Sequence, residues 1–274
     1  MLCQNWIVDK RVKLLSLHHR PSYPMPIGHI VMFAGFSHSM CDVDYLMSTL
    51  ARGLCQCGFF VAQVEMRGHG DDPEEFTIVD LDTLREDIQT ALAYYGEFTI
   101  DNLYCIGRGL SAALLAECLD NVRIEGIAGI APYCIYPEHV KQCLPSIKSE
   151  SVDAYEIFTG DDYVDHADFD ENALAVLHAL GALPYNLHGM PISKRFLDQL
   201  VCFDALPALR QNPKNNALWL FPRVDGSGEV ETFVFGEHRN YPTLNRYRHA
   251  LPRNPKFAKA LLPVLQDWLQ VSYI

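Results

Sequence analysis

The stretch that decides the fold of this chain is Leu103-Tyr104-Cys105-Ile106-Gly107-Arg108-Gly109-Leu110-Ser111-Ala112-Ala113. Its first four residues form a short apolar run, which is typical of a strand buried on both faces. Small residues then occupy positions 107, 109 and 111–113, which favours a sharp turn followed by a helix that packs closely on the strand. The stretch therefore predicts a strand, a tight turn with Gly109 at its apex, and a helix.

Strand-like and helix-like runs alternate on both sides of this stretch. The predicted strands are 6–8, 12–17, 30–33, 59–64, 103–106, 124–130, 217–221 and 232–235, and the predicted helices are 43–54, 81–92, 111–119, 172–180, 192–200 and 255–270. The first two strands form a hairpin around Asp9-Lys10, and Gly58 is a candidate C-terminal cap. The alternation of strand and helix predicts the α/β class, with a mostly parallel central sheet flanked by helices.

The segment 133–216 interrupts this alternation. Its acidic residues, from Glu150 to Glu171, have no Lys or Arg among them. They lack the glycine that a calcium-binding loop needs at its bend, so we expect a solvated acidic face and no metal site. The predicted organisation is a core of residues 1–132 and 217–274, with residues 133–216 as a helical lid insertion.

Composition narrows the classes of function. The chain has 274 residues, 49% of them hydrophobic, which is enough for a large core. A net charge of −12 argues against nucleic acid as a partner. No apolar run is long enough to span a membrane, and the N-terminus has no signal-peptide pattern. Nine cysteines without a C-x-x-C pair indicate a reduced, cytoplasmic protein, and no cofactor is expected.

Three further motifs accompany the turn at Gly109. They are Phe33-Ala34-Gly35-Phe36-Ser37-His38-Ser39, Glu65-Met66-Arg67-Gly68-His69-Gly70-Asp71 and Gly236-Glu237-His238. In this order, the four motifs resemble the α/β-hydrolase superfamily: the oxyanion loop, the D-x-R-G-x-G-x-S turn, the G-x-S-x-G nucleophile elbow and the triad histidine. The resemblance implies an α/β-hydrolase fold. It departs from the pattern at the elbow, where Gly109 stands in place of the serine.

The resemblance also implies roles for individual residues. His238 is the expected base, the amides of Phe36 and Leu110 the expected oxyanion donors, and Ser37 and His38 line that loop and are candidate ligand contacts. Asp225 is the first candidate for the triad acid. A plain hairpin turn over Asp225-Gly226 explains the same residues, and Asp161 or Asp162 is the alternative acid.

Two looser resemblances suggest the type of ligand. The turn Arg108-Gly109-Leu110-Ser111-Ala112 is similar to the A-S-S-L-S-A turn of bioluminescence acyl-transferases, which are acyl-carrier thioesterases. The run from Leu187 to Leu197 resembles a segment of exosortase-associated hydrolases, some of which also lack the serine. These likenesses imply a small apolar or acyl ligand, free or carrier-bound.

Three functions follow from a missing nucleophile. The first is a non-catalytic protein that binds an acyl or other apolar ligand, or a partner protein. The second is an esterase, thioesterase or acyl-transferase with an unconventional nucleophile such as Ser111, since Cys105 lies within a core strand. The third is an enzyme in which His238 acts as a general base without a covalent intermediate. The sequence favours the first.

Overall fold

The fold is seen in a computed structural model. It describes residues 1–22, 25–36, 38–42, 45–72, 79–98, 102–119, 122–132, 157–159, 162–164, 192–203, 205–211, 216–222, 230–234 and 256–271.

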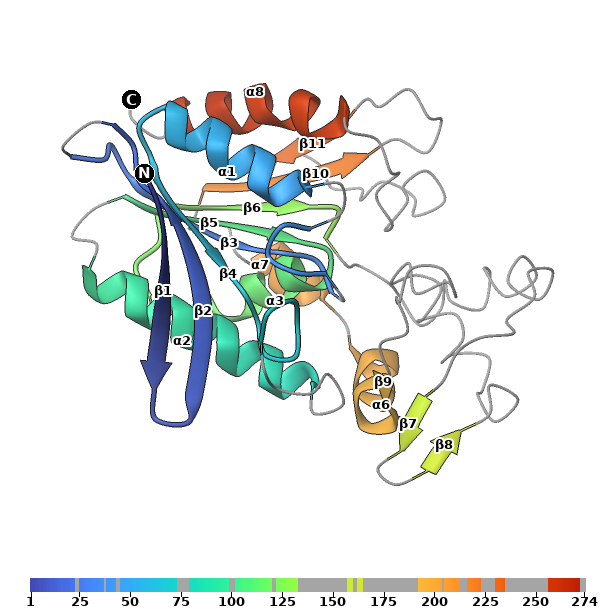
Figure 1. The fold of residues 1–274 in the computed structure, drawn as a ribbon. Coiled ribbons are helices and arrows are strands. Elements are labelled where there is room, and N and C mark those ends of the chain that lie inside the picture. The colour runs from blue at the N-terminus through green and yellow to red at the C-terminus, as the bar shows by residue number, and fades with distance from the viewer. Residues whose placement is uncertain are drawn as a thin grey trace.

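The central feature is an eight-stranded sheet in the order β1-β2-β4-β3-β5-β6-β10-β11 (Figure 1). Its strands are β1 (Leu2–Asp9), β2 (Val12–His19), β3 (His29–Phe33), β4 (Phe60–Val64), β5 (Leu103–Arg108), β6 (Gly126–Ile130), β10 (Asn216–Pro222) and β11 (Val230–Val234). The five strands from β4 to β10 are mutually parallel, while β2 is antiparallel to β4 and β1 to β2. β11 is antiparallel to β10. The mostly parallel sheet and the opening hairpin are both confirmed.

Helices cover both faces of the sheet (Figure 1). One face carries α1 (Leu46–Gln56) and α8 (Lys256–Val271), and the other carries α2 (Leu81–Phe98), α3 (Leu110–Glu117) and α7 (Leu206–Gln211). As predicted, α1 is followed by a glycine in a left-handed conformation, Gly58 with φ 103°. That conformation suits a residue without a Cβ and lets the chain turn back into β4.

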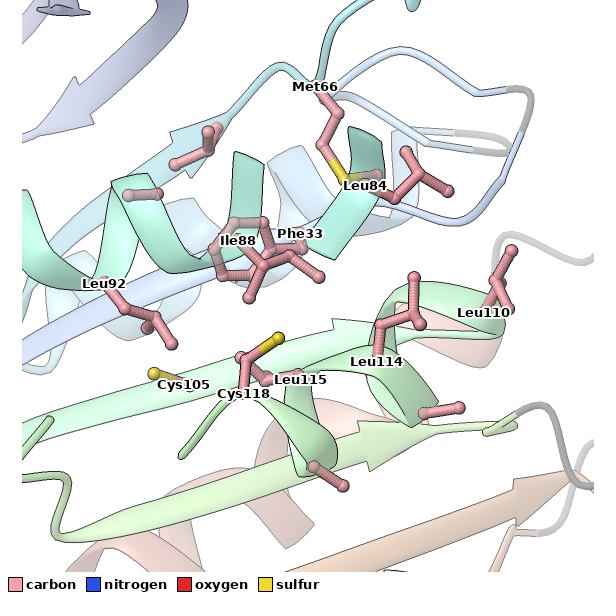
Figure 2. Close-up of a cluster of buried hydrophobic side chains, with 14 of the residues drawn as sticks. Phe33, Met66, Leu84, Ile88, Leu92, Cys105, Leu110, Leu114, Leu115 and Cys118 are labelled. Carbon is pink, nitrogen blue, oxygen red and sulfur yellow. The ribbon is translucent and has the colours of Figure 1, made fainter. Parts of the chain in front are cut away.

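Successive side chains of β5 belong to two hydrophobic clusters, one on each face of the sheet. Cys105 joins the cluster under α2 and α3, whereas Tyr104 joins the cluster under α1 and α8. Figure 2 shows Cys105 among Phe33, Ile88, Leu92 and Leu115. On the opposite face, the ring of Tyr104 lies edge-on to Trp268, with their centroids 5.6 Å apart. β5 is thus buried on both faces, as its apolar sequence predicts.

The segment between β6 and β10 contains a second, small sheet. It is built from β7 (Ile157–Thr159), β8 (Asp162–Val164) and β9 (Ile192–Ser193), in the order β8-β7-β9. The helix predicted over 192–200 is present as α6 (Lys194–Cys202), and the helix predicted over 172–180 lies outside the described residues. α7 was not predicted, and its Leu209 is part of the main core beside α3.

Among the helices that the structure describes, none combines the length and the apolar character needed to cross a bilayer.

Candidate active site

The turn between β5 and α3 has the shape that the sequence predicts. Gly109 has φ 55° and ψ −123°, a conformation that side-chain-bearing residues rarely adopt. Its amide donates to the carbonyl oxygen of Ile130 on the neighbouring β6 over 3.0 Å, and its carbonyl accepts from the Ala113 amide over 3.3 Å. Both backbone groups therefore fix the apex between the strand and the helix.

The two glycines of the turn, Gly107 and Gly109, differ in the room that each leaves for a Cβ. A Cβ on Gly107 would lie 2.7 Å from the Cα of Ala112, so only glycine lets the helix approach the strand this closely. Among the described residues, a Cβ on Gly109 would have no atom within 4 Å. No described atom therefore fills the space in which a nucleophile's side chain would begin, and Gly109 itself has no side chain.

Ser111, the alternative nucleophile, uses its hydroxyl elsewhere. The side chain is 1% exposed, and Oγ donates to the carbonyl oxygen of Ala34 over 2.6 Å. This bond ties the first turn of α3 to the chain that follows β3. Cys105 is fully buried, and burial raises the pKa of its thiol, which disfavours the thiolate. Neither group is placed to attack a ligand above Gly109.

A buried ion pair holds the loop after β3, where the sequence predicts the oxyanion amide. The Asp42 carboxylate accepts through Oδ2 from the Gly35 amide at 2.9 Å and from Arg108 Nε at 2.6 Å. The Arg108 guanidinium lies so close over Gly35 that no Cβ fits there. Sequence reasoning missed this pair, although an arginine at the end of an apolar strand is a signal for a buried acidic partner.

Apolar groups surround the loop next to the elbow. The ring of Phe36 lies edge-on to Phe196 of α6, at 5.0 Å between centroids, and to His69 at 5.9 Å. Phe196 is fully buried, and it belongs to the same cluster as Phe36 and Leu110. His38, the other described residue predicted to line the loop, is half-buried, and its amide donates to the Gly35 carbonyl over 3.2 Å. Ser37 lies outside the described residues.

The turn after β4 is held by charged and polar contacts of its own. Arg67 Nε lies 2.5 Å from Asp87 Oδ1 on α2, and the Arg67 carbonyl lies 2.8 Å from Nδ1 of His69. Burial lowers the pKa of His69 to about 4, so the ring is neutral at physiological pH. Its contact with the Arg67 carbonyl fits a role in ordering this turn.

Glu65 begins the same turn and is an unusual buried acid. Its Oε1 accepts from the Met40 amide over 2.7 Å, while Oε2 lies against Gly70. Burial raises the pKa of this carboxyl to about 8, and the carboxylates of Asp71 and Asp72 add to the rise. The backbone amides of Met40 and Asp71 act in the opposite direction.

The predicted acid and base fall largely outside the described residues. This applies to Asp225, His238 and Asp161, while Asp162 opens β8 of the small sheet. β10 and β11 are antiparallel neighbours, and residues 223–229 between them lie outside the described residues. The two alternatives for Asp225, triad acid and hairpin-turn residue, both stay predictions.

The register of β11 shows how far its last residue lies from the elbow. The register places Val234 level with Ile106, three residues before Gly109, and β11 is three strands from β5. At ~3.3 Å per residue and ~4.8 Å per strand, Val234 and Gly109 are ~17 Å apart. His238, four residues after Val234, lies outside the described residues, so its place at the elbow stays a prediction.

Comparison with known proteins supports the fold. No protein-family model matches the sequence, and no curated protein matches it. Among solved structures, the chain is similar to the α/β hydrolase GrgF from Penicillium sp. sh18, with a TM-score of 0.56 and 17% identity over 83% of this chain and 81% of that one. The esterase domain of a Rhodothermus marinus protein is similar with a TM-score of 0.47 and 15% identity, over 80% of this chain and 75% of that one. Est1E from Butyrivibrio proteoclasticus, bound to ferulic acid, is similar with a TM-score of 0.44 and 13% identity, over 62% of this chain and 73% of that one.

The likeness to GrgF extends over most of both chains, but its identity is low enough that it describes shape and not activity. This chain has the mostly parallel sheet, the helices on both faces and the sharp turn after β5 that the sequence predicts. The chain therefore has the α/β-hydrolase fold, with glycine at the apex of its elbow.

Proposed function

We propose that this protein binds an acyl or other apolar ligand above Gly109 without forming a covalent bond to it. A partner protein that presents an apolar side chain to the same place is the second possible occupant. The observation that carries the proposal is a position at Gly109 that no described residue fills, at a residue that has no side chain of its own to react. Covalent acyl transfer needs an activated nucleophile, which this position does not supply.

The neighbouring groups support binding over catalysis. Ser111 is engaged with the Ala34 carbonyl, and moving its hydroxyl to the elbow apex would require breaking that bond. A displacement of ~1 Å can already cost ~100-fold in rate, so a serine two residues away is a poor substitute. Phe36 and Leu110, the predicted oxyanion residues, belong to the apolar cluster beside the elbow. Such surroundings favour an apolar ligand.

Reaction with a fluorophosphonate probe tests the non-covalent part of the proposal. We expect no labelling of the wild-type protein, with an active serine esterase as the positive control. Labelling that disappears in Ser111→Ala would overturn the proposal in favour of an unconventional nucleophile. Turnover without labelling that disappears in His238→Ala would favour the general-base alternative instead.

Binding is tested with a fluorescent long-chain fatty acid and two variants of Gly109. Gly109→Phe fills the open position, so we expect the affinity to fall at least tenfold. Gly109→Ala carries the same backbone strain but adds only a methyl group, so it is the matched control and should keep most of the affinity. Equal affinity in all three proteins, or no binding to the wild type, contradicts an apolar ligand at this place.

A further inference from the structure

β1 forms the outer edge of the sheet. Among the described strands it pairs with β2 alone, and it ends the strand order of the eight-stranded sheet (Figure 1). It contains eight residues, which is longer than the ~5–6 typical of a strand. An edge strand of this length presents a row of backbone groups that can pair with another strand.

The register shows which residues present those groups. The Met1 amine donates to the Arg20 carbonyl and the Arg20 amide donates to the Met1 carbonyl, each over 2.8 Å, so these two residues form a hydrogen-bonded pair. Such pairs alternate along an antiparallel ladder. The odd-numbered residues of β1 therefore bond to β2. The N–H and C=O groups that point away from β2 belong to Leu2, Gln4, Trp6 and Val8.

The same four residues expose their side chains. Leu2 is 59% exposed, Trp6 41% and Val8 63%, and the Lys13 ammonium lies 4.3 Å from the centre of the Trp6 ring. No residue from Leu2 to Val8 is charged, and none is proline. Charged side chains and proline are the usual means by which edge strands resist pairing, and from Leu2 to Val8 this edge has neither.

We infer that β1 pairs with β1 of a second copy of this chain, antiparallel and about a two-fold axis through Asn5. In this register Leu2 lies opposite Val8 of the second copy, and Gln4 lies opposite Trp6. Every outward N–H and C=O of the four residues then finds a partner. A two-fold axis makes such an interface self-complementary, so one sequence satisfies both sides.

Charge supports the same register. Asp9, at one end of β1, falls opposite Met1 of the second copy, whose neighbour on β2 is the exposed Arg20. The two ends of the paired strands therefore bring unlike charges together. The two tryptophans lie diagonally across the axis, a separation that aromatic side chains can bridge.

Sedimentation velocity tests the pairing. The wild-type protein at high micromolar concentration should have twice the mass of the chain. Gln4→Pro removes one outward N–H and leaves the bonds to β2 in place, and Trp6→Lys adds a charge to the exposed face, so both should give monomers. Met25→Lys adds the same charge at an apolar residue outside β1 that is even more exposed, at 80%, and is the control that should stay dimeric. A monomeric wild type, or a dimer that both β1 variants retain, overturns the inference.

A cysteine at the axis tests the register. Asn5 faces its own copy as a non-hydrogen-bonded pair, in which Cα atoms are ~4.5 Å apart, a distance suited to a disulfide. Asn5→Cys should give a covalent dimer that is absent from the wild type and is reversed by reductant. Gln4→Cys, which faces Trp6 of the second copy, should not. Efficient cross-linking of Gln4→Cys, or none of Asn5→Cys, would overturn the register about Asn5.

Discussion

Arg108 Nε lies 2.6 Å from Asp42 Oδ2, and the two side chains are 6% and 0% exposed. The pair joins the last residue of β5 to the loop that follows β3, directly beneath the elbow. Because the same Asp42 oxygen also accepts from the Gly35 amide, one carboxylate holds both the loop and the arginine. Such a charge is costly when it loses its partner inside a protein.

Removing the arginine should therefore destabilise the fold strongly. We expect Arg108→Ala to lower the free energy of unfolding by about 3–5 kcal/mol, since it leaves a buried carboxylate without its counter-charge. Urea denaturation followed by circular dichroism measures this. The control is Arg123→Ala, which removes an exposed pair with Glu125 and should cost less than about 1 kcal/mol. Equal losses in the two variants would contradict a structural role for the buried pair.

The two glycines of the elbow should respond differently to a methyl group. In Gly107→Ala the new Cβ meets the backbone of Ala112, so α3 must shift away from β5. In Gly109→Ala the methyl meets no described atom, so the expected cost is that of the positive φ, about 1–3 kcal/mol. We expect the Gly107 variant to lose clearly more stability in the same urea experiment, and the reverse order would contradict the described turn.

His69 should make the protein less stable in acid. Its folded-state pKa of about 4 lies below the ordinary value of about 6.5, so the unfolded chain binds more protons between these values. Its contribution is complete above pH 6.5 and is lost as the pH falls through about 4, for a total of about 3 kcal/mol. His69→Gln should weaken this dependence. Because burial also lowers the pKa of His18 to about 4, some acid sensitivity should remain.

Glu65 should make the protein less stable at high pH, the opposite of the effect of His69. Its folded-state pKa of about 8 exceeds its ordinary value of 4.5, so the folded chain binds more protons in this window and stability falls as the pH rises through it. Glu65→Gln keeps an acceptor for the Met40 amide but cannot ionise. We expect the variant to match the wild type near pH 5 and to exceed it by about 2–4 kcal/mol near pH 9. An unchanged difference between the two pH values would show that the carboxyl does not titrate in this range.

The sequence was most informative where local pattern decides structure. The elbow at Gly109 and the cap at Gly58 follow from small residues in fixed places, and β5 follows from its apolar run. The antiparallel direction of β11 could not be assigned, because a short apolar strand looks the same in either direction and the hairpin over Asp225 remained one of two alternatives.

Long-range contacts at the candidate site also could not be predicted from the sequence. Ser111 and Ala34 are separated by 77 positions, and no local pattern pairs a helix hydroxyl with a particular distant carbonyl. Phe196 lies in a predicted helix, but its contact with Phe36 depends on where that helix docks. The six-residue α7 was missed because it is too short for a helical period to emerge.

The bond from Ser111 to Ala34 has a consequence for any molecule that settles above Gly109. Together with Asp42, it fixes the base of the site before a ligand arrives, so little conformational entropy remains to be lost there. For the proposed ligand, discrimination would then depend on groups beside this fixed base, such as Phe196 of α6, whose ring packs against Phe36. Substitutions in these neighbouring groups would change selectivity while the elbow itself stays the same.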